Sequence, residues 1–575
     1  MRAYAKEILL LLYLLLGFEA VGDRVASLGL SLELALYAGV FALLAACAFA
    51  AAWVSNFLLR GFYALLFFGS ALFLHSTESA TDEHLTYDAF VNLFNSRGFA
   101  GDALRQYGVA IVTAALTSLP LLVGIALKPR GNPPLPRIAA VAPLAGIALL
   151  SAILFARGGD GARGLPGPFA PIAYASLLAY ESGTGLGQPR QEVSLPLTRP
   201  SRRDIVLIVD ESVLGSYLDI NHRTGVRSGL LEPRRGVVVH NFGFAASITN
   251  CSVGSNVTLR YGGTRDDYHR INATMPSIWA YARRAGLRTV YIDAQGTGGM
   301  RHNLMDDAEH ALIDLFIQFD RVRVRDRDMA AADRLRRLLN DDRADFILVN
   351  KVGAHFPVHD KYPESHMHYR PALPRGMFEN ITDTGSRDGF GGGAEDWRRY
   401  RNAYRNTLTW NVGAFFERLL TGADLRRATL IYTSDHGQDL HERGEPGVTT
   451  HCSSEPVDEE GLVPLAIIEG AGAPSLDWRR HLAANRHHSS HYNIFPTLLE
   501  LMGYDPAAVR AVYGRSLAEE TRDSFTFNSR FNARLGKQPV WRHIDIRALQ
   551  STVEQDAPDS VGHAAAAARP AGQGS

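Results

Sequence analysis

The long apolar runs of this 575-residue chain are confined to about its first 155 positions. Five of them approach the roughly 20 apolar residues that a membrane-spanning helix needs, and they cover residues 7–24, 32–53, 58–75, 109–127 and 137–156. The rest of the chain has the composition of a soluble α/β protein. The sequence therefore predicts a transmembrane bundle of about five helices at residues 1–157, followed by a domain outside the lipid.

The basic residues near these runs predict how the bundle is oriented. The first run is expected to stay in the protein, because Gly17-Phe18-Glu19-Ala20 is a poor signal-peptide cleavage site. If all five runs cross, the basic residues beside them fall on one side; they are Arg2, Lys6, Arg60, Lys128, Arg130 and Arg137. Short cytoplasmic loops are rich in Lys and Arg. That side is therefore expected to face the cytoplasm, and everything after residue 157 to lie outside.

Composition divides the remainder of the chain. The 59 basic residues balance the 59 acidic ones, and no basic patch typical of nucleic-acid binding is visible. Residues 158–200 are rich in Gly, Pro and Ser, which predicts a linker with a short helix at the membrane surface at 171–180. A single large domain is predicted for residues 201–550, and a disordered tail for 551–575.

Short apolar runs alternate with helical patterns through the outer domain. The run at residues 204–209 begins with Asp204 and is continuously apolar from 205 to 209, which is typical of a strand buried on both faces of a parallel sheet. Similar runs follow at residues 289–292, 346–349, 429–432 and 462–468, with helical patterns at 276–285 and 397–420. The alternation predicts a mostly parallel sheet flanked by helices, with 204–209 as its central strand and the functional site at the carboxyl ends of the strands.

Side chains that suit a zinc ion follow two of these runs. Asp210 and Glu211 come at the end of the first predicted strand, and one of these two carboxylates could bind a metal. Asp435 and His436 come after 429–432. Carboxylate oxygens and imidazole nitrogens are common Zn²⁺ ligands. Each group alone is also explained by a turn or a helix N-cap, but similar chemistry at the ends of several strands favours a metal site.

Three further histidines belong to the same hypothesis. His355 lies on a loop after the strand at 346–349, and His451 and His491 lie further along the chain. A single histidine is just as often a structural or surface residue. With His436 they are expected to converge on one edge of the sheet.

A hydroxyl-rich segment at residues 247–256 offers a nucleophile. The run that follows it is amphipathic and predicts a helix. A hydroxyl at a helix N-terminus lies where backbone donors and the helix dipole stabilise a phosphoryl group, and a nearby metal would lower its pKa. N-capping by Ser or Thr is the competing explanation.

This constellation resembles the membrane phosphoethanolamine transferases of Gram-negative envelopes and, more loosely, the lipoteichoic acid synthases, which share the sulfatase and alkaline phosphatase fold. The resemblance implies that Glu211, Asp435 and His436 are Zn²⁺ ligands, the last two within Ser434-Asp435-His436-Gly437. Gly353-Ala354-His355-Phe356-Pro357 is similar to the family's Gly-Ser-His-Gly-Pro segment, so His355 is implied to contact the phosphoryl group or a second metal.

The later part of the chain extends the resemblance. His451 looks like the histidine that follows the family's Asp-His pair, and residues 490–495 resemble its late His-Asp-Asn-Leu-Phe element. The bundle, with a longer outer loop at residues 77–106, also matches.

The sequence departs from the family at the nucleophile. The transferases carry Cys-Gly-Thr, whereas this chain has Cys251-Ser252-Val253. Ser252 is the favoured nucleophile and metal-bound hydroxyl, ahead of Ser255 and then Thr249. The Cys-x-Pro-Ser-Arg pattern is absent, which argues against hydrolysis of sulfate esters. If Cys251 and Cys452 flank the nucleophile and a metal ligand, they could lie close enough to form a disulfide.

The resemblance implies a function and a location. The chain is expected to transfer phosphoethanolamine from a phospholipid, phosphatidylethanolamine, to a membrane-associated acceptor such as lipopolysaccharide, with one or two Zn²⁺ ions or another divalent metal. It is expected in the inner membrane with the catalytic domain in the periplasm. Transfer of phosphoglycerol, phosphodiester hydrolysis and a non-catalytic binding or sensing role remain alternatives. Residues that choose the acceptor are expected in the 77–106 loop and around 379–395.

Overall fold

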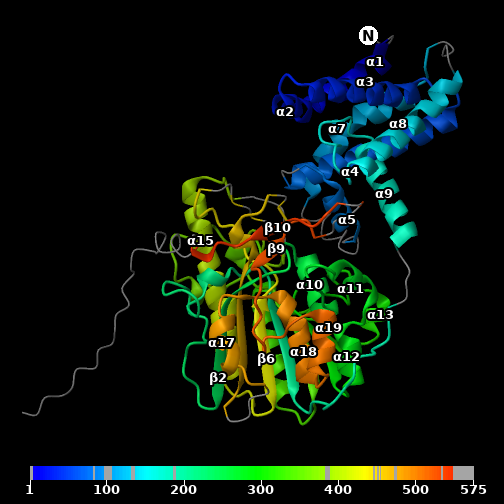
Figure 1. Cartoon of the computed structure of the whole chain (residues 1–575). Coiled ribbons are helices and arrows are strands. Elements are labelled where there is room, and N and C mark those ends of the chain that lie inside the picture. Colours follow the sequence, from blue (N-terminus) through cyan, green and yellow to red (C-terminus); the bar gives the residue numbers. More distant parts are fainter. Residues whose placement is uncertain are drawn as a thin grey trace, which may run out of the picture. The chain divides into compact units, whose positions relative to one another are not determined.

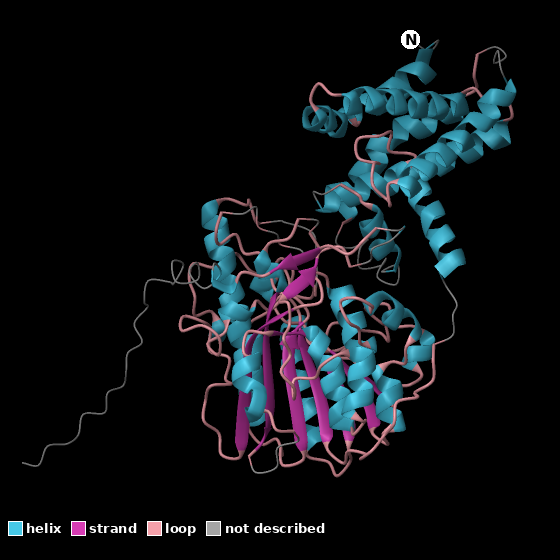
Figure 2. Cartoon of the chain, in the orientation of Figure 1, coloured by secondary structure: helices cyan, strands magenta, loops and turns pink. Residues whose placement is uncertain are grey.

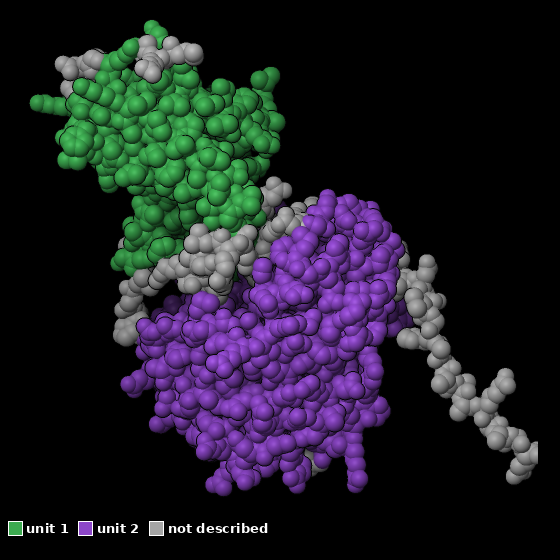
Figure 3. All heavy atoms as spheres, turned by 180° about the vertical axis from the view of Figure 1, so that it is seen from behind, with its two compact units in different colours: residues 1–189, 384–388, 530–539 green, residues 190–383, 389–529, 540–575 purple. Residues whose placement is uncertain are grey.

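The computed structural model describes residues 4–81, 84–95, 107–130, 136–185, 190–382, 389–444, 447, 449, 452–453, 455–471, 476–531, 535, 537–547 and 549. It forms two compact units (Figure 3). The helical unit comprises Met1–Pro189, Thr384–Asp388 and Arg530–Pro539, and the sheet unit comprises Arg190–Asp383, Gly389–Ser529 and Val540–Ser575. The predicted tail at 551–575 lies outside the described residues.

The helical unit is built from mostly apolar helices that pack side by side (Figure 1). They are α1 (Ala5–Leu16), α2 (Phe18–Leu28), α3 (Leu32–Ala52), α4 (Phe57–Thr81), α5 (Tyr87–Asn95), α7 (Gly108–Ala126), α8 (Pro136–Ala156) and α9 (Ala170–Gly185). Among the described residues, four helices are long and apolar enough to cross a membrane, namely α3, α4, α7 and α8. The helix expected at 171–180 is present as part of α9.

The sequence predicted about five spanning helices, whereas four of the described helices are long and apolar enough to span. The first apolar run is divided at Gly17 into α1, of 12 residues, and α2, of 11 residues. Glycine lowers helix stability, and α2 carries Glu19, Asp23 and Arg24, which make it much more polar than α1. Neither piece alone reaches the roughly 20 residues that a span needs.

Buried basic side chains gather at one end of the bundle. Lys6 Nζ donates to the carbonyl of Ala52 at 2.6 Å and to that of Gly124 at 2.9 Å, in the last turns of α3 and α7. Arg60 Nε donates to Ala126 O at 3.2 Å. These carbonyls have no partner within their own helices, and cations at helix C-termini also complement the helix dipole. Lys6 and Arg60 therefore share one end of the bundle, as the charge pattern predicts.

The sheet unit contains an eight-stranded sheet in the order β4-β3-β5-β1-β6-β7-β2-β8. Figure 2 draws the strands in magenta. The strands are β1 (Asp204–Asp210), β2 (Val237–Ala246), β3 (Arg288–Asp293), β4 (Leu315–Ile317), β5 (Asp345–Asn350), β6 (Ala428–Ser434), β7 (Leu462–Gly470) and β8 (Ser489–Ser490). All neighbours pair in parallel except β6 with β7 and β7 with β2. A separate antiparallel pair joins β9 (Thr526–Asn528) to β10 (Trp541–His543).

Helices cover both faces of this sheet. They are α10 (Ser252–Tyr261), α11 (Tyr268–Thr274), α12 (Ile278–Arg284), α13 (Asp307–His310), α14 (Arg327–Leu339), α15 (Ala394–Leu408), α16 (Phe415–Leu420), α17 (Arg479–Asn485), α18 (Ile494–Met502) and α19 (Pro506–Tyr513). In β1, Val206 and Ile208 belong to one hydrophobic core, and Ile205 and Leu207 to the other. Burial on both faces explains the continuous apolar run, and β1 lies inside the sheet as predicted.

Candidate metal centre

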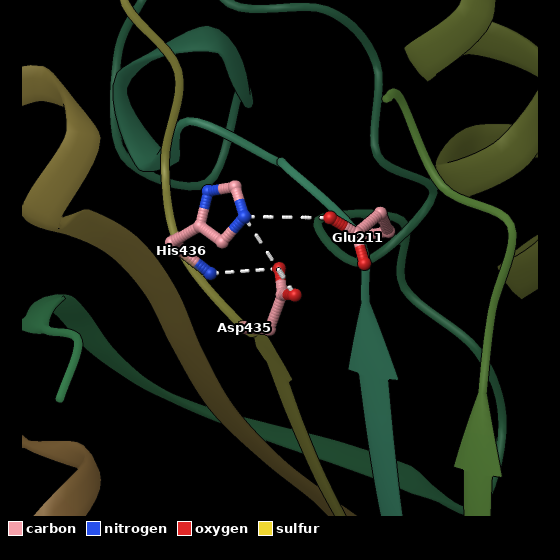
Figure 4. A group of neighbouring side chains, drawn as sticks. All are labelled: Glu211, Asp435 and His436. Atoms are coloured by element: carbon pink, nitrogen blue, oxygen red, sulfur yellow. Dashed lines mark hydrogen bonds and ion pairs between the residues drawn. The ribbon is translucent and has the colours of Figure 1, made fainter. Parts of the chain in front are cut away.

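The candidate metal ligands come together because they follow neighbouring parallel strands. Asp210, the last residue of β1, pairs in register with Ser434, the last residue of β6. The residues that come next are Glu211 on one side and Asp435 with His436 on the other. One ligand atom from each of these three buried residues lies within 4.8 Å of the others (Figure 4).

Local hydrogen bonds aim His436 at the centre of this group. Its Nδ1 lies 2.7 Å from the carbonyl of Gly437 and donates to it. In the neutral imidazole the other nitrogen, Nε2, therefore carries the lone pair, and it lies 3.4 Å from Glu211 Oε1 and 3.8 Å from Asp435 Oδ2. A Cβ on Gly437 would stand 2.0 Å from the Glu459 carbonyl, so glycine is required after the histidine.

The cluster concentrates negative charge in a buried position. Burial, with a contribution from the Glu211 carboxylate, raises the pKa of Asp435 to about 8. Burial opposes the charged form of His436, but Asp435 and Glu211 outweigh it and raise its pKa to about 9. Asp435 Oδ1 accepts from the backbone N–H groups of Ser212 and His436, whereas the buried Oδ2 has no hydrogen-bond partner among the described residues. An unpartnered carboxylate oxygen beside an imidazole lone pair suits Zn²⁺.

Ser252 is the hydroxyl that reaches this cluster. Its Oγ donates to Glu211 Oε1 at 2.9 Å and lies 3.2 Å from His436 Nε2. It is the first residue of α10, so the N-terminal N–H groups of this helix surround it. Position and neighbours both fit a nucleophile held beside a metal.

The other two candidate hydroxyls turn toward local partners. Ser255 Oγ donates to the carbonyl of Thr249 at 3.3 Å, and Thr249 Oγ1 lies 3.5 Å from Asn250 Oδ1. The structure thus brings Ser252 to the three ligands and leaves the alternatives outside that group.

A disulfide joins Cys251 to Cys452. It connects the residue before Ser252 to a segment that follows Asp435 and His436, and Cys452 N–H also donates to the Asn250 carbonyl at 3.0 Å. The bridge considered from the sequence is therefore present. It fixes the start of α10 against the loop after β6.

The histidines are positioned differently from one another. His355 is buried, and its loop packs on Glu211, where Ala354 N–H donates to the Glu211 carbonyl at 2.8 Å. A Cβ on Gly353, whose φ is +58°, would lie 2.4 Å from that carbonyl, so only glycine allows this approach. His491 lies behind the cluster, with Nε2 3.0 Å from Thr433 Oγ1. His451 lies outside the described residues.

Sequence reasoning missed a supporting layer around Glu211. Gln295 Nε2 donates to Glu211 Oε2 at 3.1 Å and to the Lys351 carbonyl at 2.9 Å. Lys351 is fully buried, and its ammonium donates to Asp210 Oδ2 at 2.9 Å and lies 3.9 Å from Asp328. Gln295 and Lys351 both follow strands of the same sheet. Their position after a strand was the feature of the sequence from which both residues could have been predicted.

Comparisons with known proteins agree with this architecture. The integral membrane lipooligosaccharide phosphoethanolamine transferase A from Neisseria meningitidis shares 18% identity, with a TM-score of 0.58 over 88% of this chain and 96% of that one. The C-terminal periplasmic domain of EptC from Escherichia coli shares 18% identity, with a TM-score of 0.44 over 58% of this chain and 93% of that one. At such identity, the first likeness establishes a shared fold.

No curated protein matches the chain in sequence. The family model described as Sulfatase matches residues 203–504, which span the sheet unit from the start of β1 to the end of α18. This match includes every described residue of the candidate metal centre. Because it covers more than half of the 575 residues, the chain belongs to the sulfatase family.

Proposed function

We propose that this protein transfers phosphoethanolamine from a phospholipid to an acceptor of the bacterial envelope, such as lipopolysaccharide, through a covalent phospho-enzyme on Ser252. The observation that carries the proposal is the contact of the Ser252 hydroxyl with both Glu211 and His436 at the start of α10. The fold shared with the Neisseria transferase over most of both chains supports the choice of group transferred.

Glu211, Asp435, His436 and the Ser252 oxygen are the proposed ligands of one Zn²⁺ ion. Zn²⁺ bound there would lower the pKa of the serine hydroxyl and offset charge on the phosphoryl oxygens. Gln295 holds Glu211, and the Gly437 carbonyl fixes the imidazole of His436. Outer partners of this kind orient metal ligands and tune their basicity.

The reaction divides into two transfers. Ser252 Oγ attacks phosphorus, the bond from phosphorus to the diacylglycerol oxygen breaks, and diacylglycerol leaves with the proton that the serine gives up. An acceptor hydroxyl or phosphate oxygen then attacks the phospho-serine, and Oγ is released with a proton from the acceptor or solvent. The N-terminus of α10 stabilises the phosphoryl charge in both steps.

His355 and His451 are proposed to contact the phosphoryl oxygens or to hold a second metal ion. Attachment to helices that can cross a membrane supports this chemistry, because donor and acceptor are confined to the lipid surface and tethering raises their effective concentration. We place the protein in the inner membrane with the sheet unit in the periplasm.

Intact-mass measurement of the purified full chain tests the proposal. After incubation with phosphatidylethanolamine and Zn²⁺, the wild type and Ser255→Ala should gain the mass of one phosphoethanolamine group, and Ser252→Ala should gain none. Ser255→Ala is a matched control, because it removes a hydroxyl from the same helix.

Other outcomes select the alternatives. A phosphoglycerol adduct with phosphatidylglycerol would replace the proposed donor. Release of free phosphoethanolamine without modified acceptor would make the protein a phosphodiesterase. An unmodified wild type with every phospholipid tested would leave the non-catalytic binding or sensing role.

A further inference from the structure

A partly open cavity of about 220 Å³ lies in the helical unit, between α1, α4 and α7, and several polar side chains stand in its mainly apolar lining. Its walls include the ionisable side chains of His75 and Glu78 on α4 and the hydroxyls of Tyr13, Thr113 and Thr117. At about 30 Å³ for a water molecule in the liquid, the space would hold roughly seven waters. Ionisable side chains are costly among membrane-spanning helices and commonly mark a functional site.

The cavity lies at the end of the bundle opposite the buried basic side chains. Arg60, at the start of α4, bonds the Ala126 carbonyl at the end of α7, and Glu78 follows about 27 Å further along α4 at 1.5 Å per residue. The hydrocarbon layer of a membrane is about 30 Å thick. Glu78 therefore falls at the depth of lipid head groups.

This end of the bundle is also the one at which α8 finishes. The hydroxyl of Tyr63, in the first turns of α4, donates to the carbonyl of Ala140 in the first turns of α8 at 2.6 Å. The two helices therefore start at the same end and finish at the same end. The chain continues from the cavity end toward the sheet unit.

The polar groups of the lining include several acceptors, and the described residues contribute no Lys or Arg to it. Glu78 Oε1 accepts from Leu85 N–H and lies 3.4 Å from His84 Nδ1, whereas the described residues give Oε2 no hydrogen bond. The Tyr13 hydroxyl and His75 Nε2 lie 3.4 Å apart. Such a lining suits a cation with several N–H donors and disfavours an anion.

We propose that this cavity binds the primary ammonium head group of phosphatidylethanolamine. A primary ammonium has three N–H donors, and Glu78 supplies a balancing charge, with the imidazole of His75 and the hydroxyl of Thr113 as further acceptors. The head group of phosphatidylglycerol brings no positive charge to balance Glu78. This inference rests on the proposed function, in which phosphatidylethanolamine is the donor. It adds that the helical unit selects this lipid.

Native mass spectrometry of the full chain, released from micelles that contain equal amounts of phosphatidylethanolamine and phosphatidylglycerol, measures this selection directly. All variants carry Ser252→Ala, so that no transfer consumes the lipid. The parent should retain phosphatidylethanolamine in preference, and Glu78→Gln should reduce that preference by about tenfold. Glu33→Gln is the matched control, because it removes an exposed carboxylate from α3 of the same unit and should keep the preference.

A second variant guards against a folding defect in the first. Thr113→Leu fills part of the cavity from an exposed position and leaves Glu78 in place, so it should also lower retention while the thermal midpoint stays unchanged. Equal retention in Glu78→Gln and Glu33→Gln would overturn the inference. Displacement of the lipid by millimolar free ethanolamine would assign the cavity to a soluble amine instead. If the Ser252→Ala parent selects phosphatidylethanolamine but the wild type never forms the phospho-enzyme with it, the proposed function is wrong and this inference still holds.

Discussion

The two oxygens of Asp435 have separate tasks. Oδ1 accepts from two backbone N–H groups and fixes the loop after β6, whereas Oδ2 is buried without a hydrogen bond among the described residues. A buried polar atom without a partner costs about 1–3 kcal/mol. A bound cation would remove that cost, so binding of the proposed metal would be coupled to local stability at this one atom.

Asp435→Asn separates these tasks, because the amide keeps an oxygen for the backbone donors and loses the charge. We expect the purified variant to bind Zn²⁺ at least about tenfold more weakly, measured by metal analysis after dialysis against a graded zinc buffer. The control is Asp266→Asn, which changes an exposed side chain. Full zinc occupancy in Asp435→Asn at limiting metal would exclude this residue from the ligand set.

At the residue scale, the sequence was sufficient where a side chain directly follows a strand. Asp435 and His436 were found because parallel strands deliver their next residues to one edge. The same reasoning left Asp210 and Glu211 open, and the family resemblance chose Glu211. Ser252 was already favoured over Ser255 from the sequence, and the coordinates add the direction of each hydroxyl, since the Ser252 hydroxyl contacts Glu211 and His436 and the Ser255 hydroxyl contacts the Thr249 carbonyl. Gln295 was missed because a neutral amide looks like any polar loop residue.

Among the elements, β1 carries an acidic side chain at its buried start. Asp204 is 5% exposed, and its Oδ1 accepts from Asp345 N–H at 2.9 Å. Burial raises the pKa of Asp204 to about 7, against about 3.9 in an unfolded chain. The fold therefore favours the protonated carboxyl. Its contribution to stability is complete below about pH 4 and is lost as the pH rises through about 7.

Asp204→Asn should remove this pH dependence, because asparagine retains the acceptor and cannot ionise. Thermal melting followed by circular dichroism should give a variant midpoint that rises above that of the wild type as the pH goes from 4 to 8.5, by about 3 °C at the upper end. The control, Asp266→Asn, should have the same thermal midpoint as the wild type at every pH in this range. A constant difference across the range would show that Asp204 does not titrate as proposed.

Strands and helices with one continuous hydrophobic pattern could be predicted from the sequence. Those whose pattern is interrupted by polar residues or glycine could not. The five predicted strands all occur, because residues buried on both faces give continuous apolar runs. β2 was missed, since His240, Asn241 and Gly243 interrupt it and the register shifts there. The first apolar run was read as one helix, although Gly17 divides it. The helical pattern at 397–420 continues through a π-helical turn at Thr409–Ala414, which periodicity alone does not reveal.

For the whole molecule, the arrangement of helix ends predicts which loops share a side of the membrane. Lys128 follows α7 at the end where Lys6 and Arg60 lie, and the sheet unit follows α8 at the other. In spheroplasts, a membrane-impermeant maleimide should label Asp266→Cys and should leave Lys128→Cys unlabelled until the membrane is permeabilised. Both positions are exposed. Native background is low, because Cys47 is buried and the other two cysteines are bonded. Equal labelling of both variants in intact cells would contradict this topology.

The order of strands in the sheet also delays the folding of the Ser252 segment during synthesis. β2 leads into the Ser252 segment, yet its neighbours in the sheet are β7 and β8, which come much later in the chain. Cys251 can form its disulfide only after the ribosome has added Cys452, 201 residues later. At about 5–20 residues per second, this interval lasts roughly 10–40 s. The serine is thus fixed only after Cys452, β7 and β8 have been made. An interrupted translation product that stops before β7 would carry the serine without its scaffold.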